Sequence, residues 1–249
     1  MTDILYSEIT LKLGPKLALD NVDLHLEGDQ IIGIVGNRKA GKNYLLPMLP
    51  SFRYPTTGRL TVDGVDAFEN SSIMTKVVYT WPTEMLHNSK KVIDGLNFCK
   101  SLRPNWDMKY ALDLLRVFNL SPNAKIKKLN SRFLAVFNCI CGLASGAPIT
   151  VFDGTYMRLD DEQRRLFYKE LRESHKKHPR MIILSTYDIA EIESFIDEAV
   201  ILDKGKVIAH ETVEKITKSA QEIMEIPKVP TLQEVFIHFT EEGGGENGQ

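Results

Sequence analysis

Short apolar segments alternate with stretches of helical periodicity along the 249-residue chain. Four of the apolar segments have the length and composition of buried strands, at residues 31–35, 76–80, 149–152 and 181–185. Strands that are apolar on both faces and separated by helical stretches are typical of a parallel sheet with crossover helices. The pattern therefore predicts an α/β fold with a mostly parallel core sheet.

Two further segments have the pattern of hairpins. Residues 60–65 turn at Asp63-Gly64, and residues 199–208 turn at Lys204-Gly205. Asp-Gly and Lys-Gly pairs between alternating apolar residues favour tight turns. Both segments interrupt the strand-helix rhythm, so together they predict an antiparallel β lobe beside the parallel core.

Between residues 90 and 129 the pattern becomes helical. Asp107 stands where a helix N-cap is expected, and the apolar residues that follow it keep the spacing of one helix face. These are Met108, Ala111, Leu112, Leu115 and Phe118. The stretch predicts a helical insertion between two core strands.

The C-terminal end combines a short amphipathic stretch at 231–239 with a polar, glycine-containing end at 241–249. We expect residues 1–240 to form the folded domain and 241–249 to be a disordered tail, because the tail has too few apolar residues to pack.

Composition narrows the classes of function. The chain has 31 basic and 33 acidic side chains, a net charge of −2, so nothing indicates bulk binding of nucleic acid. It has no apolar run of about 18 residues and no secretory signal at its N-terminus, which predicts a cytosolic protein unless a partner carries it to a membrane.

Cysteine usage gives little support for a metal or disulfide framework. Cys99, Cys139 and Cys141 show no Cys-x-x-Cys spacing. Cys139 and Cys141 could be metal ligands, but buried positions on a helix explain them better.

The candidate chemistry lies in a Gly-x4-Gly-Lys loop that follows the apolar segment at 31–35. In phosphate-binding loops of this kind, backbone N–H groups and the lysine hold phosphates, and a Ser or Thr hydroxyl binds Mg²⁺. We therefore predict a nucleotide-binding loop made of Gly36, Asn37, Arg38, Lys39, Ala40, Gly41, Lys42, Asn43 and Tyr44.

Two positions of this loop depart from the usual pattern. Asn43 replaces the hydroxyl residue, and Lys39 stands where a glycine is common. An amide oxygen can ligate a hard cation but is bulkier, and Pro47 crowds the helix behind the loop. We expect magnesium binding by Asn43 and Asp153 to be weaker than usual, and ATP and Mg²⁺ binding to be weak or absent.

The loop, the apolar segment that ends in Asp153 about 110 residues later and the helical insertion between them resemble the nucleotide-binding subunit of an ABC transporter. Further matches are Ala-Leu-Asp-Asn-Val-Asp-Leu at 18–24, Ser-Thr-Tyr at 185–187 and Ile-Leu-Asp-Lys-Gly-Lys at 201–206. Arg-Pro-Asn-Trp-Asp at 103–107 with Leu-Ser-Pro at 120–122 is similar to exporters whose membrane subunits are separately encoded.

This resemblance implies a P-loop NTPase fold of the ABC ATPase type, with a helical subdomain at about 88–146. It also implies membrane subunits and a second nucleotide-binding subunit as partners. The location it implies is peripheral, on the cytoplasmic face of the cell membrane.

Departures from the family pattern fall on every segment that faces nucleotide. Leu13 stands where an aromatic residue stacks on adenine, and Pro82 where a glutamine contacts the metal and the membrane subunit. The signature loop, normally close to Leu-Ser-Gly-Gly-Gln, is Leu-Asn-Ser-Arg-Phe at 129–133. Gly154 replaces the catalytic glutamate and Tyr187 the switch histidine, so no catalytic residue is predicted.

Other positions fit an interface. The resemblance places Ser131, Arg132 and Asp160 at the dimer interface and Trp81 and Pro82 at the site where the membrane subunit docks. Simpler explanations exist for the retained residues. Lys42 could be a surface lysine, Asp153 a cap or turn residue, Asp160 a helix N-cap with Gln163 in the capping-box position, and Tyr187 and Trp81 packing residues.

The leading hypothesis is a catalytically degenerate ATP-binding subunit of a heteromeric ABC exporter that serves in docking and regulation. An intact paralogue is the expected partner rather than a second copy of this chain. The alternative is a scaffold on the same fold that binds no nucleotide.

Overall fold

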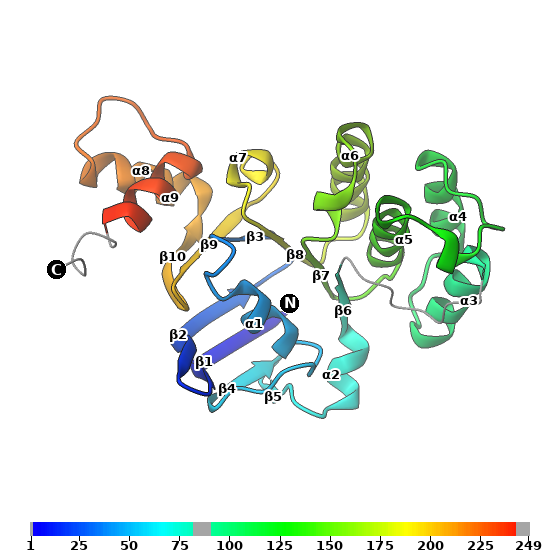
Figure 1. Ribbon diagram of the computed structural model, residues 1–249, viewed down its shortest axis with the longest axis horizontal. Coiled ribbons are helices and arrows are strands. Elements are labelled where there is room, and N and C mark those ends of the chain that lie inside the picture. Colours follow the sequence, from blue (N-terminus) through cyan, green and yellow to red (C-terminus); the bar gives the residue numbers. More distant parts are fainter. Residues whose placement is uncertain (1, 82–90, 243–249) are drawn as a thin grey trace.

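The computed structural model describes residues 2–81 and 91–242, which form two sheets and several groups of helices (Figure 1). The strands are β1 (Asp3–Leu13), β2 (Lys16–Glu27), β3 (Ile31–Val35), β4 (Thr57–Val62), β5 (Val65–Asp66), β6 (Val77–Thr80), β7 (Ile149–Asp153), β8 (Met181–Thr186), β9 (Glu198–Asp203) and β10 (Lys206–Thr212). The α-helices are α1 (Lys42–Leu45), α2 (Ser71–Lys76), α3 (Val92–Leu102), α4 (Met108–Val117), α5 (Ser131–Leu143), α6 (Asp161–Lys177), α7 (Ile189–Ile192), α8 (Val213–Ile223) and α9 (Leu232–Glu242).

The six-stranded core sheet has the order β10-β9-β3-β8-β7-β6. Strands β9, β3, β8, β7 and β6 are parallel, and β10 pairs with β9 in the antiparallel direction. The four predicted core segments are thus confirmed as strands of one sheet, except that Lys76 belongs to the end of α2.

The smaller sheet is antiparallel, with the order β2-β1-β4-β5. The expectation of an antiparallel lobe is confirmed for the segment at 60–65. It is wrong for the segment at 199–208, because β9 is a parallel member of the core sheet. A tight turn only shows that two strands pair with each other, and β9 has a second edge that pairs with β3.

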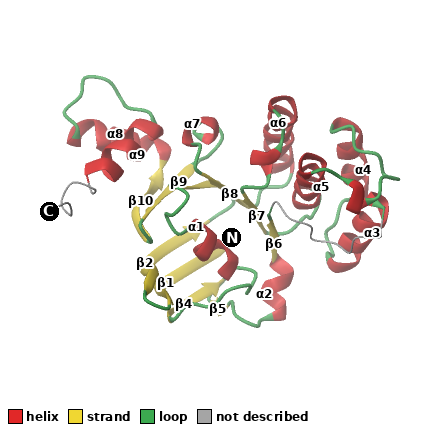
Figure 2. Cartoon of the chain, in the orientation of Figure 1, coloured by secondary structure: helices red, strands yellow, loops and turns green. Residues whose placement is uncertain are grey.

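Apolar side chains fill both faces of the core sheet. Along β3, Ile32 and Ile34 face the small sheet and α1, whereas Ile31 and Val35 face the helices. Strands buried on both faces read as continuous apolar runs, which is why the pattern revealed them. Figure 2 shows the same division, with the small sheet on one side of the core sheet and α5 to α9 on the other.

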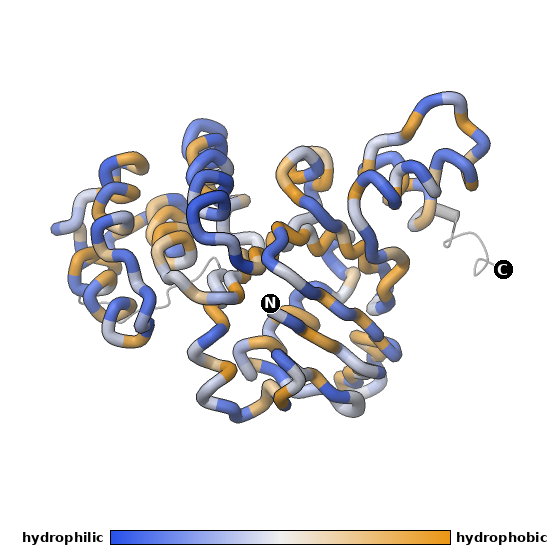
Figure 3. Tube along the Cα trace, turned by 180° about the vertical axis from the view of Figure 1, so that it is seen from behind, coloured by the Kyte–Doolittle hydropathy of each residue, from blue (hydrophilic) through white to orange (hydrophobic). Residues whose placement is uncertain are grey.

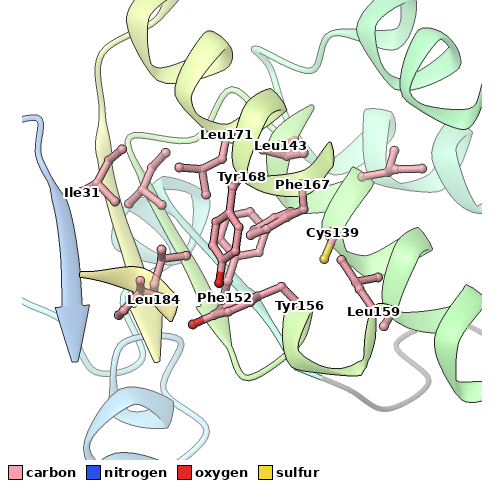
Figure 4. Close-up of a cluster of buried hydrophobic side chains, with 14 of the residues drawn as sticks. Ile31, Cys139, Leu143, Phe152, Tyr156, Leu159, Phe167, Tyr168, Leu171 and Leu184 are labelled. Atoms are coloured by element: carbon pink, nitrogen blue, oxygen red, sulfur yellow. The ribbon is translucent and has the colours of Figure 1, made fainter. Parts of the chain in front are cut away.

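Helix α5 is the buried helix of the predicted insertion between β6 and β7, and α6 lies beside it (Figure 3). In the hydropathy colouring α5 is mostly apolar and α6 mostly hydrophilic. Figure 4 shows the aromatic cluster between them, in which the Tyr156 and Phe167 rings stack with centroids 5.3 Å apart. Asp107 caps α4 as expected, since its carboxylate accepts a hydrogen bond from the Tyr110 N–H at 2.8 Å.

The C-terminal helix α9 extends to Glu242, so the first two residues of the predicted tail are helical and the others lie outside the described residues. No helix within residues 2–81 or 91–242 combines the length and the apolar character needed to span a membrane.

Gly142 generates a prediction about how α5 approaches the sheet. A Cβ at this position would lie 2.4 Å from Cε1 of Phe152 on β7, so Gly142→Ala forces the ring or the helix to move. We expect Gly142→Ala to lower the free energy of unfolding by about 1–3 kcal/mol in a denaturant titration. The cost should shrink in a Phe152→Leu background, and an equal cost in both backgrounds would contradict this packing.

Candidate functional site

The Gly-x4-Gly-Lys loop leaves β3 and enters α1 at the carboxyl end of the core sheet. Gly36 is buried, and a Cβ on it would lie 2.4 Å from the Leu202 carbonyl oxygen. Gly41 has φ of 115°, and a Cβ on it would lie 2.9 Å from Leu19 Cδ2. Both glycines are therefore required by packing against neighbouring strands, whether or not a phosphate binds.

Hydrogen bonds from the turn between β9 and β10 fix the same loop. The Gly205 N–H donates to the Ala40 carbonyl at 2.8 Å, and the Asp20 N–H donates to the Gly205 carbonyl at 2.9 Å. The loop is thus held between β2 and the β9–β10 turn.

Lys42 is buried, with 8% of its surface exposed, which excludes the surface-lysine interpretation. Its ammonium donates hydrogen bonds to the carbonyls of Gly36 at 2.5 Å and Asn37 at 3.0 Å. Desolvation lowers the pKa of Lys42 from its usual 10.5 to about 8, although the nearby Asp153 acts in the opposite direction. The ammonium therefore binds the carbonyls of its own loop, and burial makes its charged form less favourable than in water.

A cavity of about 370 Å³ opens beside this lysine. It brings together residues that the sequence analysis singled out in three separate segments, namely Arg38, Lys42 and Asn43 of the loop, Asp153 and Gly154 at the end of β7, and Tyr187 after β8. Arg158 also lines it, so among the described lining residues three cationic side chains face a single carboxylate. Such a cavity is electrostatically suited to an anion with several negative charges, such as a chain of phosphates.

Asp153 ends β7, and its carboxylate accepts a hydrogen bond from the Tyr79 hydroxyl on the neighbouring strand β6. Burial, followed by the Asp153 charge and this hydrogen bond, raises the pKa of Tyr79 well above its usual range, so the phenol remains a donor. The bond uses one lone pair of the carboxylate that would hold a metal. Sequence reasoning missed Tyr79, although its place at the end of a strand beside β7 is a usable signal.

Gly154 follows Asp153 with φ of 63°, which is left-handed. The nearest atom to a Cβ there is Met157 Sδ at 3.9 Å, so the site has room for a side chain. Gly154 itself adds no carboxylate to the cavity, where Asp153 is the one acidic residue among the described lining residues. The Tyr187 side chain is 52% exposed, and its ring lies 5.2 Å from the Arg38 guanidinium in a cation–π contact.

The helix behind the loop is short. α1 ends at Leu45, and Pro47 lies in the following 3₁₀ turn (Leu46–Met48), in agreement with the expected crowding. The Tyr44 ring makes cation–π contacts with two side chains, the Lys16 ammonium at 5.5 Å and the Arg53 guanidinium at 5.2 Å from its centroid. Asn37, Arg38, Lys39 and Asn43 are exposed.

Leu13 does not line the cavity. It is half-buried at the end of β1, where it pairs with Lys16 and packs against the small-sheet core. Leu13 therefore adds neither an aromatic platform nor an aliphatic contact to the cavity.

The predicted dimer-interface residues lie at the starts of two helices. Arg132 and Asp160 form an ion pair within the chain, and each side chain is 41% exposed. Asp160 also caps α6 by accepting a hydrogen bond from the Gln163 N–H at 2.9 Å, so its N-cap interpretation is confirmed. These contacts, first among them the bond from Gln163, lower the pKa of Asp160. Ser131 is exposed at the start of α5.

A second cavity, also of about 370 Å³, lies between β6, α3 and α5; we call it the apolar groove. Trp81 is half-buried in it and packs on Phe52 and Tyr79, with ring centroids 5.3 and 5.4 Å away. Exposed apolar side chains of Phe52, Met74, Phe98 and Leu102 line the groove. Pro82, predicted beside Trp81, lies outside the described residues.

Comparisons with known proteins agree with this geometry. No protein-family model matches the chain. An uncharacterised ABC transporter ATP-binding protein of Methanocaldococcus jannaschii is 26% identical over 216 residues, which cover 84% of this chain and 78% of that protein. A probable sulfate/thiosulfate import ATP-binding protein of Chlorella vulgaris is 24% identical over 235 residues, covering 90% and 94%.

A third relative is named as a flippase rather than as an import protein. An ATP-dependent lipid A-core flippase of Ralstonia nicotianae is 25% identical over 226 residues, and these cover 83% of this chain but 37% of the flippase. Among solved structures, the ATP-binding subunit of an ABC transporter superposes with a TM-score of 0.83 at 18% identity, covering 95% of this chain and 99% of that one.

The chain therefore has the ABC ATPase P-loop fold, with a mixed core sheet, an antiparallel β lobe and a helical subdomain. The relatives support an ATP-binding subunit of an ABC transporter, and the importers and the flippase among them leave the direction of transport to a proposal.

Lys42 generates a prediction about pH. Because its pKa is lower in the folded protein, the unfolded chain holds the proton between pH 8 and 10.5 after the folded protein has released it. Raising the pH through this window should therefore stabilise the folded wild type relative to Lys42→Met, by about 1–3 kcal/mol in denaturant titrations. The free energy of unfolding of the wild type minus that of Lys42→Met should rise with pH. A difference that stays constant or falls would contradict the buried ammonium.

Proposed function

We propose that this chain is a catalytically degenerate nucleotide-binding subunit of a heteromeric ABC exporter, which contributes docking and regulation rather than ATP hydrolysis. The observation that carries the proposal is the cavity at Lys42. It has the cationic lining that a chain of phosphates needs, yet Gly154 offers no general base.

Each requirement of hydrolysis is weakened in this cavity. General-base help contributes about 10²- to 10⁴-fold to a rate, and Gly154 supplies none. Asp153, the carboxylate that would hold Mg²⁺, is already hydrogen bonded to Tyr79. Asn43 offers an amide oxygen where a hydroxyl is usual, and the Tyr187 ring pairs with Arg38. ATP with Mg²⁺ is therefore a weak ligand, and turnover is negligible.

The apolar groove is the proposed docking site for a membrane subunit. Its walls present exposed aromatic and aliphatic side chains beside Trp81, whose carbonyl is fixed by a hydrogen bond from Asn138 Nδ2 at 2.9 Å. Aromatic residues in a well-packed pocket are typical anchors of protein interfaces. A short helix of the membrane subunit with one apolar face suits a groove of this kind, and such docking holds the chain on the cytoplasmic face of the membrane.

A second nucleotide-binding subunit with an intact site is the proposed partner. In a pair of identical chains both sites would contain Gly154 and the Arg132 replacement, so neither would hydrolyse ATP. With an intact partner, the partner's own loop and base supply the chemistry, and this chain contributes Ser131, Arg132 and Asp160 to the interface. The Arg132–Asp160 ion pair within the chain would have to rearrange if either side chain contacts the partner.

The exporter assignment rests on the segment at 103–107. In the structure this segment joins α3 to α4. Arg103 ties it to α2 by donating hydrogen bonds to the carbonyls of Met74 at 3.2 Å and Thr75 at 2.8 Å. It therefore forms one border of the groove in which we place the membrane subunit.

The purified chain should release phosphate from ATP and Mg²⁺ at least about 100-fold more slowly than 1 s⁻¹, because the base and the metal site are impaired together. Gly154→Glu should fold, at a cost of about 1–2 kcal/mol for a non-glycine residue at positive φ, and should not restore hydrolysis. Turnover on the order of 1 s⁻¹ that Lys42→Ala abolishes would refute the proposal.

A scaffold that binds no nucleotide is the second candidate, and one observation favours it. Gly36, Gly41 and Lys42, the retained residues of the loop, are all engaged in packing or hydrogen bonds within the protein. Their presence is thus explained without a phosphate.

Thermal unfolding with ATP or ADP separates the two candidates. Under the leading proposal, nucleotide at ten times its Kd should raise the Tm by about 3–6 °C, and Lys42→Ala should abolish the shift. Lys127→Ala, which removes an exposed lysine of the helical subdomain, is the control that should retain it. The absence of any shift at millimolar nucleotide would favour the scaffold.

A further inference from the structure

Two cysteines that are distant in sequence meet inside the helical subdomain. The Sγ atoms of Cys99 on α3 and Cys141 on α5 lie 3.7 Å apart, in hydrogen-bonding contact. Both are free thiols. A disulfide needs the two sulfur atoms to approach to about 2 Å, so its formation requires the two side chains to rotate toward each other from the observed contact.

The two thiols have different surroundings. Cys99 is partly exposed and Cys141 is buried, and both line the apolar groove. Contact with the Cys141 thiol lowers the pKa of Cys99, and the charge of Arg103, one helical turn away, acts in the same direction against the effect of burial. Contact with Cys99, together with burial, raises the pKa of Cys141. Cys99 is therefore the more nucleophilic and accessible sulfur, with Cys141 behind it.

Cys139 provides an internal comparison. It is buried on the same helix, two residues before Cys141, but it lies in the aromatic cluster between α5 and α6 shown in Figure 4. Burial raises its pKa well above the usual range. It does not line the apolar groove, so it is remote from an oxidant that enters there.

We propose that Cys99 and Cys141 form a reversible, redox-sensitive disulfide when the protein meets a peroxide. The Cys99 thiolate attacks one oxygen of hydrogen peroxide, the O–O bond breaks, and the products are a sulfenic acid and hydroxide, which takes up the proton that the thiol released. The Cys141 sulfur then attacks the Cys99 sulfur, the S–O bond breaks, and the oxygen leaves as water with the Cys141 proton. Two thiols and one peroxide thus give one disulfide and two waters.

The disulfide would change the apolar groove. Cys99 precedes Arg103 by four residues, and Arg103 already joins the end of α3 to α2. A covalent bond from Cys99 to Cys141 would hold α3 to α5, while Arg103 holds the end of α3 to α2. It would also change the part of the groove wall that the two cysteines form. This inference does not depend on the proposed function, since it concerns bond formation within the isolated chain.

The test is oxidation of the purified, fully reduced protein with hydrogen peroxide, followed by thiol titration and peptide mapping without reductant. We expect the number of free thiols to fall from three to one, with peptides that contain Cys99 and Cys141 linked within one chain, and a thiol reductant to reverse the change. Cys139→Ala, the matched control, should form the same link. Cys141→Ala should form none, and its Cys99 should proceed to sulfinic acid.

Cys99→Ser, at the less buried position, gives a second variant that should keep its two thiols unlinked. Retention of all three thiols in the wild type would overturn the proposal, as would a link that involves Cys139 or a second chain. Equal conversion of Cys99 to sulfinic acid in the wild type and in Cys141→Ala would also overturn it.

Discussion

The close approach of the loop at 36–42 to β2 and to the β9–β10 turn is the constraint on which the rest of the site depends. Gly36 fits against the Leu202 carbonyl, Gly41 against Leu19, and the Gly205 N–H binds the Ala40 carbonyl. These contacts join the small sheet, the core sheet and the loop into one unit. They fix the backbone at the carboxyl end of β3, and so they aim Lys42 at the end of β7 whether or not a phosphate is present.

In the degenerate subunit that we propose, loss of hydrolysis and preservation of the fold are compatible because they rest on different atoms. The fold needs the backbone of the loop and its two glycines, whereas the proposed loss of hydrolysis concerns Gly154, Asn43 and Tyr187, which belong to neither hydrophobic core cluster. Gly154 has open space around it, so an exchange between glycine and a carboxylate residue at this position carries no packing penalty. The Lys42 ammonium binds loop carbonyls and also lines the cavity.

The sequence predicted those parts that depend on local pattern. The core strands at 31–35 and 149–152 were evident because strands buried on both faces are continuously apolar, and the Asp107 cap because it binds its own helix. Contacts between separate elements were missed. Tyr79 meets Asp153 only because β6 pairs with β7 in register, and Cys99 meets Cys141 only because two helices pack. The segment at 199–208 was wrongly assigned to the antiparallel lobe for a similar reason, since its turn does not indicate that β9 also pairs with β3.

Hydrogen exchange of the loop amides without nucleotide tests the central claim most directly, because it asks whether the protein alone holds the loop. If packing fixes the loop, the N–H groups of Ala40, Tyr44, Leu45 and Gly205, each hydrogen bonded in the structure, should exchange slowly in the nucleotide-free protein. Adding ATP and Mg²⁺ at ten times the Kd should slow them by no more than about another tenfold. Fast exchange that becomes slow only when nucleotide is added would contradict the account.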